Sequence, residues 1–407
     1  MRKVSKRLVF YISGFDPRGA AYYHGLYQRE GAKQAGLTGV RIETGPRHRE
    51  GDLVSAWDIE ADDGQGSVHT TFRFLRWDDI VRANWTRDRA KLIGEIYRTF
   101  WNSLRSGHLG RMRALSWPFA ATALVPVAQV SGSILAGLLL MLLIGLIGAK
   151  IAALPLWVAW ALAGACGGLA LLALLNLCEK TNAFWLARLL SASMRYAEGK
   201  LPQIDARCRE FAEIIANCLA RENCDEVILV GHSVGSELAV QTVARLIERD
   251  AALGRDGAKF GLLTLGQTIP GHGQLPEASS FRAALLAVAT APHVDWIDFS
   301  APPDPACFAL VDPVAACSLN RPEGVDEKPK LLSPRFARLF DQAHYSELKR
   351  SKMTMHFMYL LASDKPGDYD YFAITAGSKT LAKRYAHLET VRDFGRLKGG
   401  RKRGGSE

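Results

Sequence analysis

The pentapeptide GHSVG, Gly231 to Gly235, has the residue types and spacing that best fit a chemical task. Ser233 follows an apolar run, Val227 to Val230, and precedes a segment of helical character. A serine at a strand-to-helix turn needs Gly231 and Gly235, because a side chain at either position would collide with the strand or the helix. The turn lifts the hydroxyl clear of the sheet and aims the helix N-terminus and the Val234 N–H at the reaction centre. The spacing therefore predicts a serine nucleophile.

In this context GHSVG resembles the nucleophile motif of the α/β-hydrolase superfamily. The resemblance covers residues 1–85 and 200–390, and it implies a lipase, esterase or thioesterase without choosing among them. It also implies an α/β fold with a mostly parallel sheet covered by helices. In that family the nucleophile comes first along the chain, the acid second and the histidine third.

The predicted acid is Asp304, in the loop SAPPDPAC. This loop follows an expected strand, His293 to Phe299, and the ligand site of an open α/β sheet lies at the carboxyl ends of its strands. Asp312 and Asp298 are the alternatives. An aspartate beside prolines is also a common turn former, so a purely structural role for Asp304 stays open.

The predicted base is His356, in the apolar stretch MTMHFMYLL. His344 and His387 are alternatives in more polar surroundings. The family usually carries this histidine in a loop after the last strand, whereas the pattern around His356 is helical, so a histidine packed on the apolar face of a helix is the competing interpretation. His232 is expected to pack or to contact substrate, because adjacent side chains on a tight turn point apart.

The loop SGFDPRG, Ser13 to Gly19, is the candidate for the second half of an oxyanion hole. It follows the expected first strand, and the family takes one backbone N–H from a loop at this position. We predict the Phe15 N–H as this donor, beside that of Val234. Ser13 stands where the family usually has histidine, and we expect Asp16 and Arg18 to fix the loop. A plain β-turn is the alternative.

The elements needed to hold these residues follow from hydrophobic patterning. Strands alternate with helices after residue 200, which predicts a parallel sheet with both faces covered. An earlier pair of strands flanks an Asp-Asp-Gly turn and predicts a β-hairpin. The expected strands are Arg7–Ile12, Ser55–Glu60, Ser67–Leu75, Asp225–Val230, Phe260–Leu265, His293–Phe299 and Leu331–Phe336. The expected helices are Tyr22–Gln34, Arg87–Leu104, Ile204–Arg221, Ser236–Glu248, Glu277–Ala289 and Tyr345–Leu361.

A long apolar block interrupts this pattern. No charged residue lies between Arg113 and Lys150, or between Lys150 and Glu179, and each interval exceeds the ~20 residues that span a bilayer. We predict two transmembrane helices, 124–148 and 155–177, within a hairpin over 117–178. Trp117, Trp157 and Trp160 are expected near the interfaces, where indole rings collect.

The expected domain order is an N-terminal part of the α/β domain over 1–110, the hairpin over 117–178, the C-terminal part over 200–390 and a basic tail over 396–407. The formal net charge is +10, and the tail could contact anionic lipid. Seven cysteines without a CxxC pair favour a reducing compartment. Positive residues flank the hairpin, so we expect the catalytic domain and both termini in the cytoplasm.

Several function classes find no support in the sequence. It has no P-loop, no GxGxxG after a strand and no HExxH, and its basic residues do not alternate with aromatic ones as in nucleic-acid motifs. We therefore expect no cofactor, metal or nucleic acid. The sequence predicts a membrane-anchored serine hydrolase of esters or thioesters, with a lipid-like substrate as one option. The alternative is a catalytically silent scaffold of the same fold that binds a partner.

Overall fold

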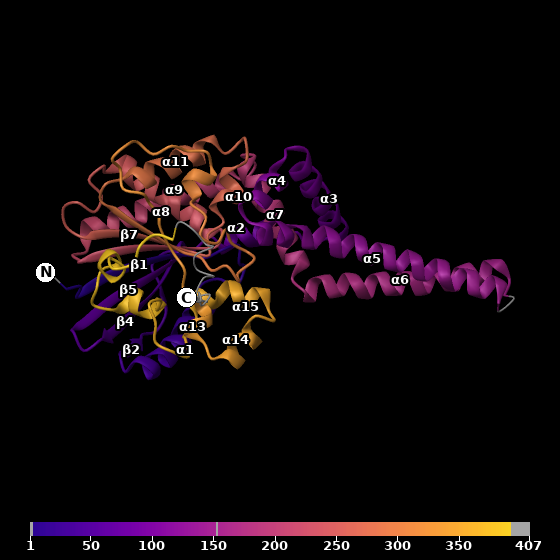
Figure 1. Cartoon of the computed structure of the whole chain (residues 1–407), viewed down its shortest axis with the longest axis horizontal. Helices are drawn as coiled ribbons and strands as arrows, with labels where there is room; N and C mark the ends of the chain where they lie inside the picture. Colours follow the sequence, from indigo (N-terminus) through magenta and orange to yellow (C-terminus); the bar gives the residue numbers. More distant parts are fainter. Residues whose placement is uncertain (1–2, 152–153, 392–407) are drawn as a thin grey trace, which may run out of the picture. The chain divides into compact units, whose positions relative to one another are not determined.

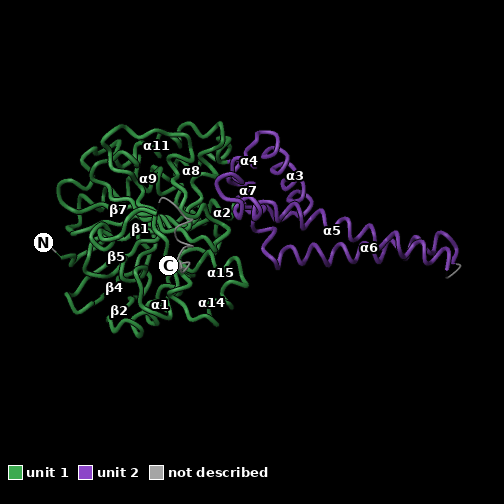
Figure 2. The backbone as a smooth tube through the Cα atoms, in the orientation of Figure 1, with its two compact units in different colours: residues 1–83, 196–407 green, residues 84–195 purple. Residues whose placement is uncertain are grey.

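A computed structural model describes residues 3–151 and 154–391. The chain divides into two compact units, Met1–Ala83 with Tyr196–Glu407 and Asn84–Arg195, called unit 1 and unit 2 below (Figure 2). The segment 84–110 thus belongs to unit 2, although the sequence predicts it as part of the α/β domain. The predicted basic tail, 396–407, lies outside the described residues.

Unit 1 is built on one sheet of nine strands (Figure 1). The order across the sheet is β2-β4-β5-β1-β6-β7-β8-β9, and β3 pairs with β4. Of the described strands, β4 runs against all the others, so the sheet is mixed but mostly parallel. The bounds are β1 Lys6–Ile12, β2 Arg41–Thr44, β3 His48–Arg49, β4 Val54–Asp62, β5 Ser67–Leu75, β6 Glu226–His232, β7 Lys259–Leu265, β8 Val294–Phe299 and β9 Lys330–Leu332.

Helices cover both faces of this sheet (Figure 1). One face carries α8 (Pro202–Arg221), α9 (Gly235–Arg249) and α11 (Ser279–Thr290). The other carries α1 (Ala20–Thr38) and the short C-terminal helices α13 (Phe336–Leu339), α16 (Tyr371–Ala376) and α17 (Leu381–Arg384). Since the central parallel strands are covered on both faces, they read as continuous apolar runs, and every residue of β6 is buried.

Unit 2 is helical. Two long helices, α5 (Trp117–Lys150) and α6 (Leu156–Lys180), form an antiparallel hairpin. They approach closely where glycines face each other, since a Cβ on Gly167 would lie 2.8 Å from the Gly137 carbonyl oxygen. At the end of the hairpin away from its turn, α3 (Arg89–Arg105) and α7 (Ala183–Ala197) share an apolar cluster with both long helices. A short helix, α4 (His108–Leu115), lies between α3 and α5 in the sequence.

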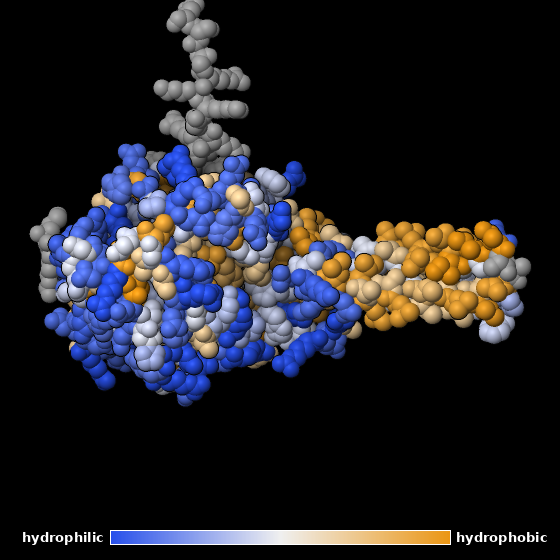
Figure 3. Space-filling model, turned by 90° about the horizontal axis from the view of Figure 1, so that it is seen from below, coloured by the Kyte–Doolittle hydropathy of each residue, from blue (hydrophilic) through white to orange (hydrophobic). Residues whose placement is uncertain are grey.

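Both hairpin helices are long and apolar enough to cross a membrane, by length and composition. In each helix only 22% of the most apolar stretch is buried. The outer surface of the hairpin is largely hydrophobic, as the colouring in Figure 3 shows, and it includes exposed leucines such as Leu139 and Leu142. Helix α5 extends beyond its predicted span, 124–148, at both ends, and α6 extends beyond its predicted span, 155–177, at its C-terminal end.

The α/β class, the mostly parallel sheet and the β4–β5 hairpin are confirmed. The predicted strand Leu331–Phe336 is wrong in its second half. Strand β9 ends at Leu332, Pro334 cannot donate to a ladder, and Phe336 begins α13. The predicted helix Tyr345–Leu361 is divided into α14 (Gln342–Leu348), α15 (Lys352–Phe357) and a 3₁₀ turn, Met358–Leu360.

Candidate active site

Ser233 lies on a sharp turn between β6 and α9. Its φ is +59°, in the left-handed region that side chains rarely adopt. The Ser233 N–H donates to the Leu265 carbonyl of β7 at 2.9 Å, and the Ser236 hydroxyl donates to the Ser233 carbonyl at 2.6 Å. These bonds hold the strained residue in place, as is common where strain serves function.

The two glycines of the motif have steric reasons to be glycine. A Cβ on Gly231 would lie 2.7 Å from the Gly235 carbonyl oxygen and from the Ser236 Cα. A Cβ on Gly235 would collide with the carbonyl oxygens of Ile12 and Ser13. The turn therefore closes against the end of β1 only with glycine at both positions.

The structure brings His356 and Asp304 together. His356 extends from α15, Asp304 lies in the loop after β8, and the His356 Nδ1 is 2.8 Å from the Asp304 Oδ2. Ser233, His356 and Asp304 are 4%, 3% and 1% exposed. Because an ionised Asp304 can only accept, the Nδ1–H donates to it, and Nε2 remains the ring nitrogen that can take up a proton.

Asp304 is held as a carboxylate by its partners. Burial by itself would raise its pKa, but the attraction and the hydrogen bond of His356 outweigh burial, so the pKa lies below its usual value. The Tyr359 hydroxyl donates to Oδ2 at 3.1 Å, and the Ala306 N–H donates to Oδ1 at 3.0 Å. The carboxylate is therefore fully buried yet well paired, which is what an acid that orients a histidine requires.

His232 connects the turn to the helix that carries His356. Its Nε2 lies 2.9 Å from the His356 carbonyl oxygen, and the two imidazole rings are 5.0 Å apart. Burial, and then the neighbouring charge of His356, lower the pKa of His232 to about 3. The ring is therefore neutral, and its Nε2–H donates to the carbonyl. The sequence predicts packing or substrate contact for His232, and the structure gives it a hydrogen bond that links the residue before Ser233 to residue 356.

The alternative acids and bases have other partners. Asp298 accepts hydrogen bonds from Thr264 and Ser300, and burial raises its pKa to about 7 in spite of them. Asp312 caps α12 (Pro313–Ala316) and pairs with Arg321. The alternative bases, His344 and His387, are more exposed and face other aspartates. His344 lies 2.8 Å from Asp364, and His387 lies 4.0 Å from Asp368.

The loop after β1 lies against the nucleophile. A Cβ on Gly14 would be 2.9 Å from the Ser233 Cβ and 3.3 Å from its Oγ. Phe15, the next residue, is buried with its ring against Trp77, and the Trp77 indole donates to the Ser13 carbonyl at 2.9 Å. The backbone at Gly14 thus lies beside Ser233.

A charged cluster supports this loop. Arg18 forms an ion pair with Asp16, and its guanidinium stacks 3.7 Å over the Tyr22 ring and 4.8 Å over the Phe357 ring. The Tyr23 hydroxyl donates to Asp16 at 2.8 Å. Phe357 is the neighbour of His356, so this cluster links the Ser13–Gly19 loop to the helix of the candidate base.

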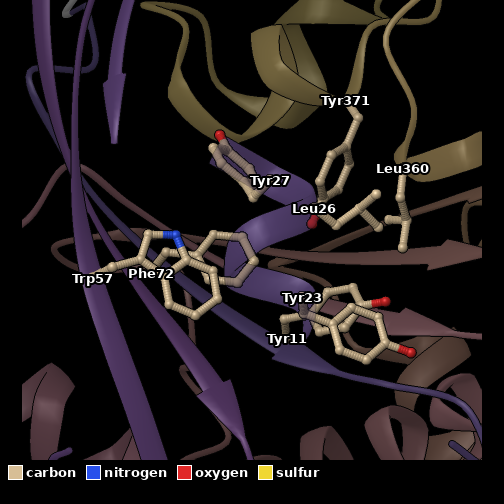
Figure 4. A pocket seen from close by; sticks show the side chains of 8 residues that line it. All are labelled: Tyr11, Tyr23, Leu26, Tyr27, Trp57, Phe72, Leu360 and Tyr371. Atoms are coloured by element: carbon tan, nitrogen blue, oxygen red, sulfur yellow. The ribbon is translucent and has the colours of Figure 1, made fainter. Parts of the chain in front are cut away.

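A small aromatic cavity lies on the α1 face of the sheet (Figure 4). Its free volume of about 10 Å³ is far below the range usual for small-molecule pockets. Tyr23 lines it and also holds Asp16, so we assign the cavity to the support of the loop. The lining residues are Tyr11, Tyr23, Leu26, Tyr27, Trp57, Phe72, Leu360 and Tyr371.

Sequence reasoning missed Tyr359. Its hydroxyl donates to Asp304 and accepts the Ala301 N–H at 2.9 Å, so it fixes both the acid and its loop. A tyrosine in an apolar run near His356 gives no separate signal, because the same pattern is typical of core packing. Among the described residues no group of three His, Cys, Asp or Glu is arranged to hold a metal ion.

Comparisons of this chain with protein-family models, with characterised proteins and with solved structures find no match.

Proposed function

We propose that the protein is a serine hydrolase of the α/β-hydrolase type that cleaves carboxylic esters or thioesters. The single observation that carries the proposal is the combination of a strained serine on a strand–helix turn with a buried His356–Asp304 pair. A buried, ionised aspartate on the Nδ1 of a histidine has little value for packing, since burying a charge costs free energy. The same arrangement is what acyl transfer needs.

In the proposed mechanism, the His356 Nε2 takes the proton of the Ser233 hydroxyl as Oγ bonds to the carbonyl carbon. Asp304 orients the imidazole and stabilises the imidazolium. The N–H groups of Phe15 and Val234 hold the oxyanion of the tetrahedral intermediate. His356 then gives the proton to the leaving alcohol or thiol, and a water molecule releases the acyl group by the same steps.

We further propose that α5 and α6 anchor the enzyme in a membrane. Their exposed leucines would otherwise face water, where burial of such surface is strongly favoured. An anchored active site would meet substrates that partition into lipid, so a lipid-like ester is the substrate class we favour.

For the topology, we propose that the catalytic domain and both termini are cytoplasmic. Arg111, Arg113 and Lys180 flank the hairpin, whereas Lys150 is the charge at its turn, and positive residues favour the cytoplasmic side. The test uses Ile151→Cys and, in unit 1, Asp256→Cys, with Cys166, Cys218 and Cys224 replaced by serine. In intact cells an impermeant maleimide should label position 151 and not position 256, and the reverse result overturns the orientation.

Turnover of a panel of acyl esters and thioesters by the purified full-length protein tests the activity. Ser233→Ala should lower hydrolysis by about three orders of magnitude or more. Ser346→Ala, at an exposed serine on α14, is the matched control and should leave turnover unchanged. Equal rates for wild type and Ser233→Ala would refute the nucleophile, and a folded protein without turnover on any ester would favour the silent scaffold.

A further inference from the structure

Polar contacts within unit 2 indicate where along the hairpin a bilayer boundary would fall. At 1.5 Å per residue, α5 measures about 50 Å, well beyond the ~30 Å hydrocarbon core of a bilayer. Three hydrogen bonds cluster at the end of the hairpin away from its turn: Arg89 to Asn176 at 2.8 Å, Thr181 to Gln129 at 2.8 Å and Tyr97 with Ser131 at 2.9 Å. From Ser131 to Lys150 there are about 20 residues, the length that the core requires. The headgroup boundary therefore falls near residues 129–131 and 176–181.

Helix α3 packs against the hairpin at this level. Leu92 and Ile96 are buried in a cluster with Val130 and Leu175. The helix runs across the direction of α5 and α6 and not along it (Figure 2). If the hairpin crosses the bilayer, α3 lies in the plane of the headgroups.

An apolar stripe is exposed on α3 beside the face that packs on the hairpin. Tyr97, Trp101 and Leu104 are 37%, 54% and 49% exposed. They are spaced i, i+4 and i+7, which places them in one stripe on the helix. An exposed stripe with a tryptophan at its centre is unfavourable in water and typical of a helix at a membrane interface.

A basic stripe runs beside the apolar one. Lys91, Arg98 and Arg105 are exposed and recur every seven residues, so they share one side of α3. Glu95 is the single acidic residue of the helix, and it is buried with hydrogen bonds from Thr86 and Ser191. The exposed charge of α3 is thus positive, and α4 adds Arg111 and Arg113. Such a surface complements anionic phospholipid headgroups.

We infer that α3 is an interfacial helix that docks on an anionic bilayer surface, with Trp101 at the boundary between headgroups and acyl chains and the basic stripe on lipid phosphates. The inference rests on the proposed membrane crossing of the hairpin. We favour a lipid surface over a protein partner because α3 packs on the proposed membrane span and because its exposed charge is positive.

The experiment uses the full-length protein in phosphatidylcholine vesicles with about one third phosphatidylserine. Nitroxide labels are attached singly to Trp101→Cys, Asn102→Cys and Leu142→Cys, with Cys166, Cys218 and Cys224 replaced by serine, and collisions with oxygen and with a water-soluble nickel chelate are measured. Position 142, on the exposed side of α5, reports insertion of the hairpin independently of α3. Position 102 is exposed on the polar side of α3 and is the matched control.

We expect the ratio of oxygen to nickel-chelate collisions to be several-fold higher at 101 than at 102, and highest at 142. Vesicles of phosphatidylcholine alone should lower the ratio at 101 and leave that at 142 unchanged. A label at 142 in lipid with equal ratios at 101 and 102 overturns the interfacial helix and leaves the anchor intact. A label at 101 that is immobilised and shielded from both oxygen and the chelate would mean that protein, and not lipid, covers the stripe. A label at 142 accessible to the chelate overturns the anchor and the interfacial helix together.

Discussion

The two units use the same aliphatic residues in opposite ways. In unit 1, leucines such as Leu229 and Leu263 are fully buried in the sheet, and charged side chains near Ser233 are buried with partners. In the hairpin of unit 2, leucines such as Leu139 and Leu142 are about half exposed. Since apolar surface of this extent is costly in water, the difference separates a unit that buries its own aliphatic side chains from a unit whose long helices leave theirs exposed, as the proposed membrane anchor requires.

The largest expected effect would come from breaking the acid–base pair of unit 1. His356→Ala and Asp304→Ala should each lower ester turnover by about three orders of magnitude, because the triad acts as a unit. For the same reason, neither should add its full effect to that of Ser233→Ala. The measurement is kcat/KM with the best ester of the panel.

His344→Ala is the control for this pair, since His344 is half exposed and faces Asp364. It should retain wild-type turnover. If His344→Ala abolished activity and His356→Ala did not, the base would have been misassigned.

Truncation of a leucine should affect the stability of the two units differently. Leu229→Ala, in β6, should lower the free energy of unfolding by about 2–5 kcal/mol, because it leaves a cavity in a closed core. Leu142→Ala, on the exposed side of α5, should change it by no more than about 0.5 kcal/mol. Denaturant unfolding in detergent micelles measures both. Equal losses would mean that the hairpin surface is covered by protein.

The link between His232 and His356 should have a smaller effect. His232→Ala leaves a buried carbonyl without its donor, which costs about 1–3 kcal/mol. We expect kcat to fall with little change in KM, because residue 356 loses its position while substrate binding is retained. His232→Gln can still donate to the carbonyl and should recover most of kcat. No recovery with glutamine would mean that His232 acts only by filling space.

The last of these predictions concerns the pH dependence of stability that Asp298 confers. Burial raises its pKa to about 7, whereas an unfolded aspartate titrates near about 3.9. The native state therefore binds the proton more tightly, and the free energy of unfolding should fall as pH rises from about 4 to about 7, by at most about 1.4 kcal/mol per pH unit. In Asp298→Asn this decline should be reduced. Parallel pH profiles for both proteins would contradict the raised pKa.

Much of the sheet could be predicted because its strands are apolar runs bounded by turn residues, and the Asp-Asp-Gly turn fixed the β4–β5 pairing. The end of β9 was missed since Leu331 to Phe336 is interrupted only by Pro334. The break of the 345–361 helix depends on Ser351, which caps α15 by accepting the Thr354 N–H, and a single serine in a polar run is a weak signal.

In the candidate site, Ser233, Gly231 and Gly235 could be recognised because the turn restricts residue types over five consecutive positions. The pairing of Asp304 with His356 joins residues 52 positions apart, and spacing along the chain does not encode such a contact. The bond of His232 to the His356 carbonyl and the role of Tyr359 depend on side-chain directions that only the folded chain defines.

If Ser233 is a nucleophile, a fluorophosphonate should react with it covalently, and the adduct can be mapped. The full-length protein is treated with the probe, digested, and the modified residue is located by mass spectrometry. We expect one adduct per chain, on Ser233, and none in Ser233→Ala. Loss of the adduct in His356→Ala, with retention in His344→Ala, would tie the reactivity of the serine to its predicted base. An adduct on another residue, or a labelled Ser233→Ala protein, would contradict the account.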